Sequence, residues 1–401
     1  MRDIHPEALI KKREGHTVRN MWQSIFLLAI ASIISGVALR LVEPMLPQLA
    51  EDFGSSISGA SIVISGFAIA YTIGQLIYGP LGDRFGKLRV VTLSLVGAAV
   101  ASIGCALAPD LASLAVLRFI TALFSSSPVT LGMAHVGDQV PVAERQSVIA
   151  RFVTGTIIGQ AFGPLLGGLL TDLIGWRGTF VVLGLAFIAV AAVLFVSTRA
   201  QWSSAASGGS PYTVHLRLLG VSRVRYVLAA AFADTFFFFG AYSFLGPFLK
   251  LKFDLGPTVI GAILAVVGLG SILYTLAVKR LLAAMGQRGL VTWGGAICCA
   301  CYALALLAPQ WAVAIPCAVG IGFSFYMLQN TLQLKATEMA PQARGAGMSL
   351  YASAWSAGQG CGVALAGAAI SVAGYAPTIF SFGLGFLALG LLLRNNLSRL
   401  S

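Results

Sequence analysis

Long apolar windows separated by short polar joins are the feature that most constrains this chain. Each window holds about 20 predominantly apolar residues, enough for a helix to cross a hydrocarbon core of ~30 Å. Inside lipid, only helices and closed barrels satisfy all their backbone hydrogen bonds. The windows lie at about residues 22–42, 58–80, 88–108, 112–134, 148–171, 178–197, 226–249, 258–278, 289–308, 311–334, 346–372 and 377–393. We therefore expect an all-α membrane protein with twelve transmembrane helices.

The composition agrees with lipid as the surrounding solvent. Charged residues make up only 10% of the 401 positions, apolar residues make up 57%, and the mean hydropathy is +0.87, whereas soluble domains carry roughly 25% charged residues. The net charge of +12 does not predict a nucleic-acid partner, because the basic residues lie singly or in small groups between windows. The six cysteines lie inside apolar stretches and are expected to pack as small apolar residues. No metal or cofactor is expected.

The positions of the basic residues predict the orientation. With a cytoplasmic N-terminus, 21 of the 26 Lys and Arg residues lie on the cytoplasmic side, which is the usual bias of inner-membrane proteins. The other five are Arg40, Arg118, Arg177, Lys250 and Lys252. We expect a multi-pass protein of a bacterial inner membrane with both ends in the cytoplasm. Residues 1–21 and 395–401 are predicted to be tails, and the first is too long for a signal peptide.

An internal repeat predicts two related halves. A constant offset of 199 residues relates a run of identical positions in the two parts of the chain. The run includes Arg145 and Arg344, Gly159 and Gly358, Gln160 and Gln359, Gly163 and Gly362, and Phe187 and Phe386. Residues 22–198 and 226–394 are thus predicted to form two pseudo-symmetric six-helix bundles. Residues 199–225 would join them as a cytoplasmic linker, flexible over its Ser/Gly-rich part at 203–211.

The join between the second and third windows carries an ordered polar motif. Its glycines permit a tight turn, and its basic residues hold the loop in the cytoplasm. Its members are Gly79, Gly82, Asp83, Arg84, Gly86, Lys87 and Arg89. The string resembles the signature loop between helices 2 and 3 of the major facilitator superfamily, with a degenerate second copy at residues 279–288. The resemblance covers essentially the whole chain. It implies the major facilitator fold, with Asp83 and Arg84 latching one half to the other, and we group Arg145 with this gate.

The fifth window contains a glycine–proline pattern formed by Gly159, Gly163, Pro164, Gly167 and Gly168. Glycines four residues apart clear one face for a partner helix, and a proline bends the helix. The eighth window offers small residues in return, at Gly261, Gly268 and Gly270. Ordinary packing is one interpretation. The pattern is also similar to the helix-5 motif of antiporters in this superfamily, notably the drug:proton group with twelve spans, and that resemblance favours export.

Four ionisable residues inside the windows are candidates for proton coupling: Asp234, Glu43, Arg118 and Arg40. A charge at the bilayer centre costs about 2.5–3.5 kcal/mol, so each residue needs a partner or a wet cavity. Arg118 resembles the helix-4 arginine that this family links to proton transfer, and a structural salt bridge is the alternative. Arg40 and Glu43 share a helix face by their i, i+3 spacing, and we expect Arg118 to lie within reach of Glu43 as well. An unpaired carboxyl group at the depth of Asp234 is expected to be uncharged. Asp234 and Glu43 are thus rival proton sites.

Polar and aromatic stripes within the windows are candidates for the wall of a substrate cavity, since amides in membrane helices face the bundle and not the lipid. Hydrogen bonding between helices is the alternative role for each stripe. The candidates are Tyr71, Gln75, Phe238, Tyr242, Tyr326, Asn330, Gln333, Trp355 and Gln359.

The leading functional hypothesis is a proton-coupled antiporter that exports a small, partly apolar organic molecule, as drug-efflux proteins do. Proton symport or facilitated uptake of a metabolite is the second hypothesis. An enzyme is not expected, because the chain lacks the HExxH, GxSxG and GxxxxGK[ST] motifs and its four histidines are scattered. The expected partners are the substrate, protons and lipid, with no nucleic acid, and the expected state is a monomer.

Overall fold

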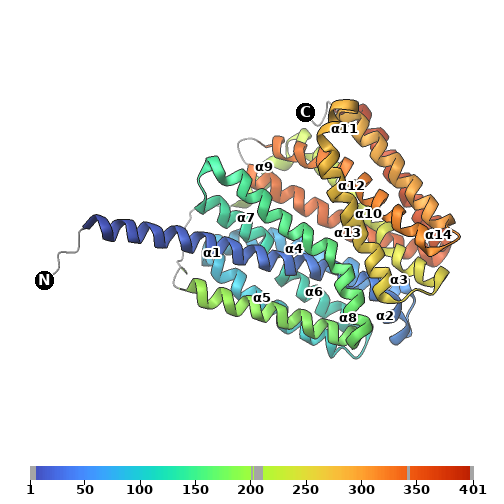
Figure 1. The fold of residues 1–401 in the computed structure, drawn as a ribbon, viewed down its shortest axis with the longest axis horizontal. Coiled ribbons are helices and arrows are strands. Elements are labelled where there is room, and N and C mark those ends of the chain that lie inside the picture. Colours follow the sequence, from blue (N-terminus) through green and yellow to red (C-terminus); the bar gives the residue numbers. More distant parts are fainter. Residues whose placement is uncertain (1–5, 200–201, 203–210, 341–343, 398–401) are drawn as a thin grey trace.

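The computed structural model describes residues 6–199, 202, 211–340 and 344–397, and this part of the chain is helical without a strand (Figure 1). The ends of both predicted tails and most of the Ser/Gly-rich linker lie outside the described residues. The elements are α1 (Pro6–Arg40), η1 (Glu43–Met45), α2 (Leu46–Asp52), α3 (Ile57–Ala60), α4 (Ile62–Phe85), α5 (Lys87–Ala106), α6 (Leu111–Ser125), α7 (Ser127–Gln139), α8 (Val142–Thr198), α9 (Pro211–Leu219), α10 (Ser222–Phe253), α11 (Pro257–Leu307), η3 (Trp311–Val313), α12 (Ala314–Glu338), α13 (Arg344–Ala373) and α14 (Tyr375–Asn396).

The described helices make twelve membrane crossings. Ten stretches are long and apolar enough to span a membrane, and two of them, Arg151–Thr198 and Pro257–Leu307, are 48 and 51 residues long. Each long stretch reverses at a glycine with a positive φ, 75° at Gly175 and 63° at Gly286. Residues with a side chain rarely adopt that conformation, so each glycine ends one crossing and begins the next. The twelve predicted windows are therefore confirmed as helices.

The glycine contacts make the repeat visible in three dimensions. In the first half, glycines of α8 lie against carbonyl oxygens of α1, and in the second half glycines of α13 lie against carbonyl oxygens of α10. The contacts are Gly159 with Ile33, Gly163 with Val37, Gly358 with Phe232, and Gly362 with Phe236. Adding 199 to both residue numbers of each pair in the first half gives the corresponding pair in the second half. The two predicted six-helix bundles thus use one packing arrangement twice.

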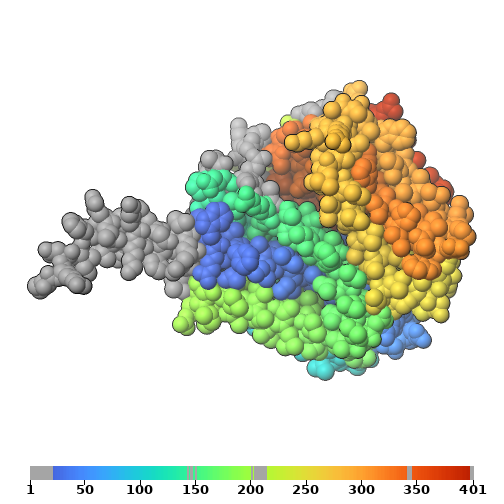
Figure 2. Space-filling view, viewed as in Figure 1, coloured from blue at the N-terminus to red at the C-terminus, as the bar shows by residue number. Residues whose placement is uncertain are grey.

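The two halves meet along two helix pairs. Helix α8 of the first half packs against α11 of the second, and α4 packs against α13. In the space-filling view the green surface of α8 borders the yellow surface of α11 (Figure 2). One cluster of buried apolar residues runs through both halves. The two halves are therefore joined along these two helix pairs over a shared apolar core.

Hydrogen bonds between the halves gather at one end of the molecule. We call this end, where α1 finishes at Arg40, the distal end, and the end that contains Gly86 and Gly286 the proximal end. Five of the side-chain hydrogen bonds between described residues of the two halves locate this contact, and four of them lie toward the distal end. These four join Ser58 to the Gly367 carbonyl, the Thr258 amide to Asp172, Arg40 to Gln359, and Ser243 to Glu43. The fifth, from Ser356 to Gln75, lies near mid-membrane. The distal end is closed.

Two regions differ from a simple picture of tails and linkers. The described part of the N-terminal tail is helical and continuous with the first span, because α1 begins at Pro6. Within the predicted linker, α9 runs over Pro211–Leu219 and packs against α13 and α10. A proline at the first position favours a helix start, which the linker composition alone did not reveal.

Candidate transport cavity and buried ionisable groups

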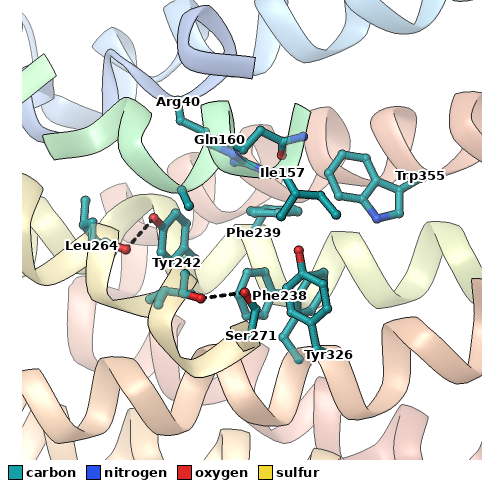
Figure 3. Close-up of a pocket in the computed structure, with 14 residues that line it drawn as sticks. Arg40, Ile157, Gln160, Phe238, Phe239, Tyr242, Leu264, Ser271, Tyr326 and Trp355 are labelled. Atoms are coloured by element: carbon teal, nitrogen blue, oxygen red, sulfur yellow. Dashed lines mark hydrogen bonds between the residues drawn. The ribbon is translucent and has the colours of Figure 1, made fainter. Parts of the chain in front are cut away.

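A cavity of about 70 Å³ lies between the two halves (Figure 3). Arg40 and Gln160 line it from the first half, and aromatic rings of α10, α12 and α13 line it from the second. Pockets for drug-sized ligands measure about 300–1,000 Å³, so this space holds a few water molecules at most. The cavity must widen before an organic molecule can enter.

The structure places four of the predicted cavity residues in this wall: Phe238, Tyr242, Tyr326 and Trp355. Phe239 lines it as well, although only Phe238 of the phenylalanine run was predicted to do so. The two rings pack at right angles with centroids 4.8 Å apart, and both reach the cavity because they lie on adjacent parts of one wide helix face. The second half therefore supplies an almost continuous aromatic surface.

The other predicted cavity residues lie outside this wall. Tyr71 shares a hydrogen bond with Ser35 at 3.1 Å, and Gln75 accepts one from Ser356 at 3.5 Å. The exposed Asn330 donates to the Tyr274 hydroxyl at 3.2 Å. The half-buried Gln333 is not among the lining residues, and neither is Gln359, which binds Arg40. With the distal end closed, Tyr71, Gln75, Asn330 and Gln359 join helices to one another.

Arg40 and Glu43 form a buried ion pair at the boundary between the halves. Arg40 Nη1 donates to Glu43 Oε1 at 2.9 Å, and the two side chains are 3% and 1% exposed. Helix α1 ends at Arg40 and η1 begins at Glu43 with Pro44 in its first turn, so the predicted helix ending positions the pair. Arg40 also donates to Gln359 at 3.3 Å. Its guanidinium carbon lies 3.7 Å from the Phe239 ring centre.

The position of Arg118 corrects one expectation. Its side chain is buried, but it does not reach Glu43. Arg118 Nη2 donates to the Ala38 carbonyl at 3.1 Å, and its guanidinium carbon lies 3.9 Å from the centre of the Phe67 ring. In the described part of the chain, its Nε and Nη1 atoms have no hydrogen-bond partner. Among the described residues Arg118 forms no salt bridge, the predicted alternative, because the Glu43 carboxyl group turns toward Arg40 and the second half.

Asp234 lies in the middle of α10 and is 0% exposed. Its partner is Gln329 of α12, an amide that sequence reasoning missed. With the amide nitrogen toward Asp234, Gln329 donates to Oδ2 at 2.7 Å and accepts from Trp355 Nε1 at 2.9 Å. Asp234 Oδ1 has no partner among the described residues. The sequence did contain an indication of this role, because Gln329 is an amide inside a membrane helix three residues after Tyr326. The prediction for that helix did not include it.

The glycines of the fifth crossing serve two helices. Gly159 and Gly163 face the backbone or first side-chain carbon of α1, and Gly167 faces the backbone of Leu41 just after α1, all in their own half. Gly168 and Pro164 instead face α11, where they meet Pro257 and Gly261. Gly268 also faces α8, whereas Gly270 faces Val319 of α12 and takes no part in this contact. The predicted small-residue face therefore packs mainly within one half.

The loop residues predicted as a latch lie at the proximal end. Lys87 pairs with Asp83 at 3.3 Å and also with Asp138 of α7. Arg84 and Arg89 are exposed, and Gly86 has a φ of 88° at the turn into α5. Gly79 is half-buried, Gly82 packs on Leu131, and the side chain of Arg145 lies outside the described residues. In the described part, the ion pairs of Asp83 and Lys87 remain inside the first half.

Comparisons with known proteins agree with this architecture. One relative is an uncharacterized MFS-type transporter, YwfA, of Bacillus subtilis, which is 27% identical over 61% of this chain and 60% of its own length. The efflux pump FUBT of Fusarium oxysporum is 31% identical over 39% of this chain and 26% of its own length. The MFS-type transporter penM of Penicillium rubens is 30% identical over 44% of this chain and 35% of its own length. The alignments thus span less than two thirds of each relative.

Solved structures share the fold. A bacterial homologue of the human lysosomal transporter Spinster, in its inward-facing and unoccupied conformation, superposes with a TM-score of 0.75. Identity is 17%, and the match covers 95% of this chain and 97% of the other. The occupied form of the same homologue gives a TM-score of 0.77 at 18% identity. The sequence model of the Major Facilitator Superfamily matches residues 28–343. The chain therefore belongs to the Major Facilitator Superfamily of membrane transporters.

Proposed function

We propose that this protein is a proton-coupled antiporter that exports a small, partly apolar organic molecule by alternating access. The observation that carries the proposal is a cavity between the halves, lined by aromatic rings, with a buried carboxyl group next to its wall. Asp234 reaches the cavity residue Trp355 through one amide. The efflux pump among its relatives and the glycine–proline pattern of α8 support export. In a bacterial inner membrane, such export would contribute to drug resistance.

The energy of one proton suffices for this task. A proton that enters down ~150 mV releases about 3.5 kcal/mol, at roughly 2.3 kcal/mol per 100 mV. Since 1.4 kcal/mol is a factor of ten, a neutral substrate could be held at an outward gradient of a few hundredfold. Asp234 is the preferred proton carrier, and Glu43 is the rival. Arg40, which is already paired with Glu43, would stabilise that carboxyl group after it loses its proton, whereas a coupling role for Arg118 requires a state of the cycle in which its side chain reaches a carboxyl group.

Alternating access requires a gate at each end. At the distal end, the Arg40–Glu43 pair holds the second half through Gln359 and Ser243. At the proximal end, we propose that Asp83 and Arg84 form the latch of the opposite state, with Lys87, Arg89 and Arg145 beside them. Asp83 is paired within its own half here, as an open latch would be. The proposal also places both termini in the cytoplasm, so the distal end is the outer one, and it takes the working unit to be a monomer.

The Arg40–Glu43 pair favours one alternative, proton symport of an organic anion. Arg40 is the one charged residue among those that line the cavity. Protonation of Glu43 would free the guanidinium group of Arg40 to bind the carboxylate of a substrate. The anion and the proton would then move together. Measurements in vesicles of both orientations separate the two functions, because antiport expels the substrate as protons enter and symport accumulates it.

The first experiment is a screen of amphiphilic compounds by thermal stabilisation of the purified protein in detergent. Compounds that stabilise it are then tested for proton-linked exchange in vesicles that contain the native chain, Asp234→Asn or Glu43→Gln. We expect Asp234→Asn to bind substrate but to lose exchange. If both variants exchange substrate for protons at the native rate, neither carboxyl group couples transport and the proposal is wrong.

A further inference from the structure

The side-chain amide of Gln329 lies between a titratable group and the cavity wall. On one side, 2.7 Å away, is Asp234 Oδ2, and on the other, 2.9 Å away, is the indole nitrogen of Trp355. Asp234 is fully buried, and no described Lys or Arg lies within ion-pair distance of it. Trp355 lines the cavity beside Phe239 (Figure 3). These three side chains come from α10, α12 and α13.

The two protonation states of Asp234 require opposite orientations of this amide. An ionised carboxylate only accepts hydrogen bonds, so the amide nitrogen faces it and the amide oxygen accepts from Trp355. A protonated carboxyl group donates through its O–H. A proton on Oδ1 would find no partner, since that atom has none among the described residues. A proton on Oδ2 is hydrogen-bonded only if the amide rotates by about 180° and presents its carbonyl oxygen.

Rotation removes the acceptor from Trp355. The amide NH₂ then faces the indole N–H, so two donors meet and the hydrogen bond between them is lost. Tyr351 accommodates either state, because its hydroxyl lies 3.4 Å from the amide atom on the Asp234 side. That hydroxyl donates to a carbonyl oxygen and accepts from an NH₂ group. Trp355 can find a replacement acceptor only by turning toward water in the cavity.

We propose that Gln329 is a positioning residue that relays the protonation state of Asp234 to Trp355, and so to the shape of the substrate cavity. The role of this relay in transport rests on the proposed function, whereas the contacts of Gln329 with Asp234 and Trp355 do not. The Trp355 ring packs edge-on against Phe239 with centroids 5.5 Å apart, and Phe239 carries the Arg40 guanidinium on its face. A turn of Trp355 therefore reaches the aromatic wall and the distal ion pair together.

The sign of the relay fits antiport. A substrate that packs on Trp355 while its indole is hydrogen-bonded to Gln329 favours the ionised form of Asp234. A proton on Asp234 breaks that hydrogen bond and frees the indole to turn. By linkage, each ligand then weakens the binding of the other by the same factor. One hydrogen bond contributes about 1 kcal/mol, so we expect a factor of about five. The other titratable groups near Asp234 are Cys298 of α11 and Tyr351 of α13.

The test measures Trp355 without any substrate. The full chain in detergent is titrated with acid while its tryptophan emission is recorded, and the spectrum of Trp355→Phe is subtracted at each pH. We expect a single step in the Trp355 emission of the native chain and none in Asp234→Asn. Gln329→Met keeps the side-chain length and removes the amide, so the step should disappear although Asp234 remains. Gln329→Asn should also lose the step in emission, because its shorter side chain cannot bridge both partners. This variant replaces Gln329→Met if the methionine variant fails to fold.

Gln310→Met is the matched control, because Gln310 is exposed and precedes α12, whereas Gln329 lies inside that helix, and it should keep the step. A native chain without a step, or a step that survives unchanged in both Gln329 variants, would overturn the relay. The transport experiment fails separately: if the step behaves as stated but vesicles show no proton-linked exchange, the proposed function falls and the relay stands.

Discussion

At the residue scale, the buried charges differ in how fully their neighbours satisfy them. Arg40 has a carboxylate, an amide and an aromatic face around it. Arg118 has a single carbonyl and an aromatic face. Asp234 has one amide partner and, in the described part of the chain, one oxygen that accepts no hydrogen bond. A buried charge that lacks partners is expensive, so the under-satisfied groups are the ones whose surroundings are expected to change during a transport cycle.

The Arg40–Glu43 pair should behave as one unit in a double-mutant cycle. Removing one partner of a buried pair leaves an uncompensated charge and costs about 3–5 kcal/mol. We therefore expect Arg40→Gln and Glu43→Gln each to lower the unfolding midpoint in detergent. The double variant, which buries no charge, should recover most of that loss. Two single effects that simply add in the double variant would show that the pair is not coupled.

Arg118 should show the opposite behaviour. Because two of its nitrogens lack partners, Arg118→Met is expected to raise the stability of the resting state by about 1–2 kcal/mol while it lowers transport, as substitutions at strained functional sites do. The readouts are thermal unfolding in detergent and vesicle exchange. The control is Arg217→Met at an exposed position of α9, which should change stability by no more than about 0.5 kcal/mol. A loss of stability in Arg118→Met would assign Arg118 a structural role instead.

At the element scale, α8 combines two kinds of helix contact on neighbouring faces. Gly159 lies against the α1 backbone of its own half, whereas Gly168 lies against the Pro257 backbone of the other half. A methyl group at either position would meet backbone atoms, which cannot move aside as a side chain can. The first contact belongs to the stability of one bundle, and the second belongs to the closure between bundles.

Alanine at these two glycines should separate the two roles. Gly159→Ala is expected to cost about 1–3 kcal/mol through overpacking, seen as a lower unfolding midpoint. Gly168→Ala should instead open the distal end, which raises the labelling rate of a Ser61→Cys probe, buried against Gly367 of the other half, by about tenfold in a chain without its native cysteines. Gly66→Ala is the control, since nothing lies within 4 Å of the added atom. Equal effects of the two substitutions in both assays would refute the division.

At the scale of the whole molecule, closure of the distal end depends on a few contacts between two bundles. Asp172, near the end of the fifth crossing, accepts a hydrogen bond of 2.8 Å from the Thr258 amide at the N-terminus of α11. This carboxylate caps a helix of the opposite half, and a helix N-terminus carries partial positive charge. Loss of the Asp172 carboxylate should therefore affect the equilibrium between the distal-closed and distal-open states more than the folding of either half.

Asp172→Ala should therefore shift that equilibrium. Removing a helix cap costs about 1 kcal/mol, which corresponds to about a fivefold change in the ratio of distal-closed to distal-open molecules. Spin labels on cysteines at Leu107 and Leu307, each 79% exposed at the distal end, would report the distance between halves. Asp254→Ala is the control, because Asp254 pairs with Lys250 in its own half. An unchanged distance distribution in Asp172→Ala would count against this cap as a gate.

The sequence carried the architecture and part of the candidate site. The crossings, the repeat and the helix-5 glycines were all predictable, because the length of an apolar run and a constant offset between matching residues are visible in the linear sequence. Within the site, Phe238, Tyr242, Tyr326 and Trp355 were proposed and lie in the cavity wall. Phe239 was missed because helical spacing alone cannot say how wide a face the cavity takes.

The sequence by itself determined that lipid surrounds twelve helices in two related bundles, since burying apolar length and pairing backbone groups admit few other solutions. Only the tertiary structure decided which polar groups meet. Gln329 bridges Asp234 and Trp355, and Arg118 rests on Phe67 without reaching Glu43, because the rotation of each helix about its axis depends on every neighbour it packs against. Helix rotation is a property of the assembled bundle, whereas the existence of each helix is a property of about 20 consecutive residues.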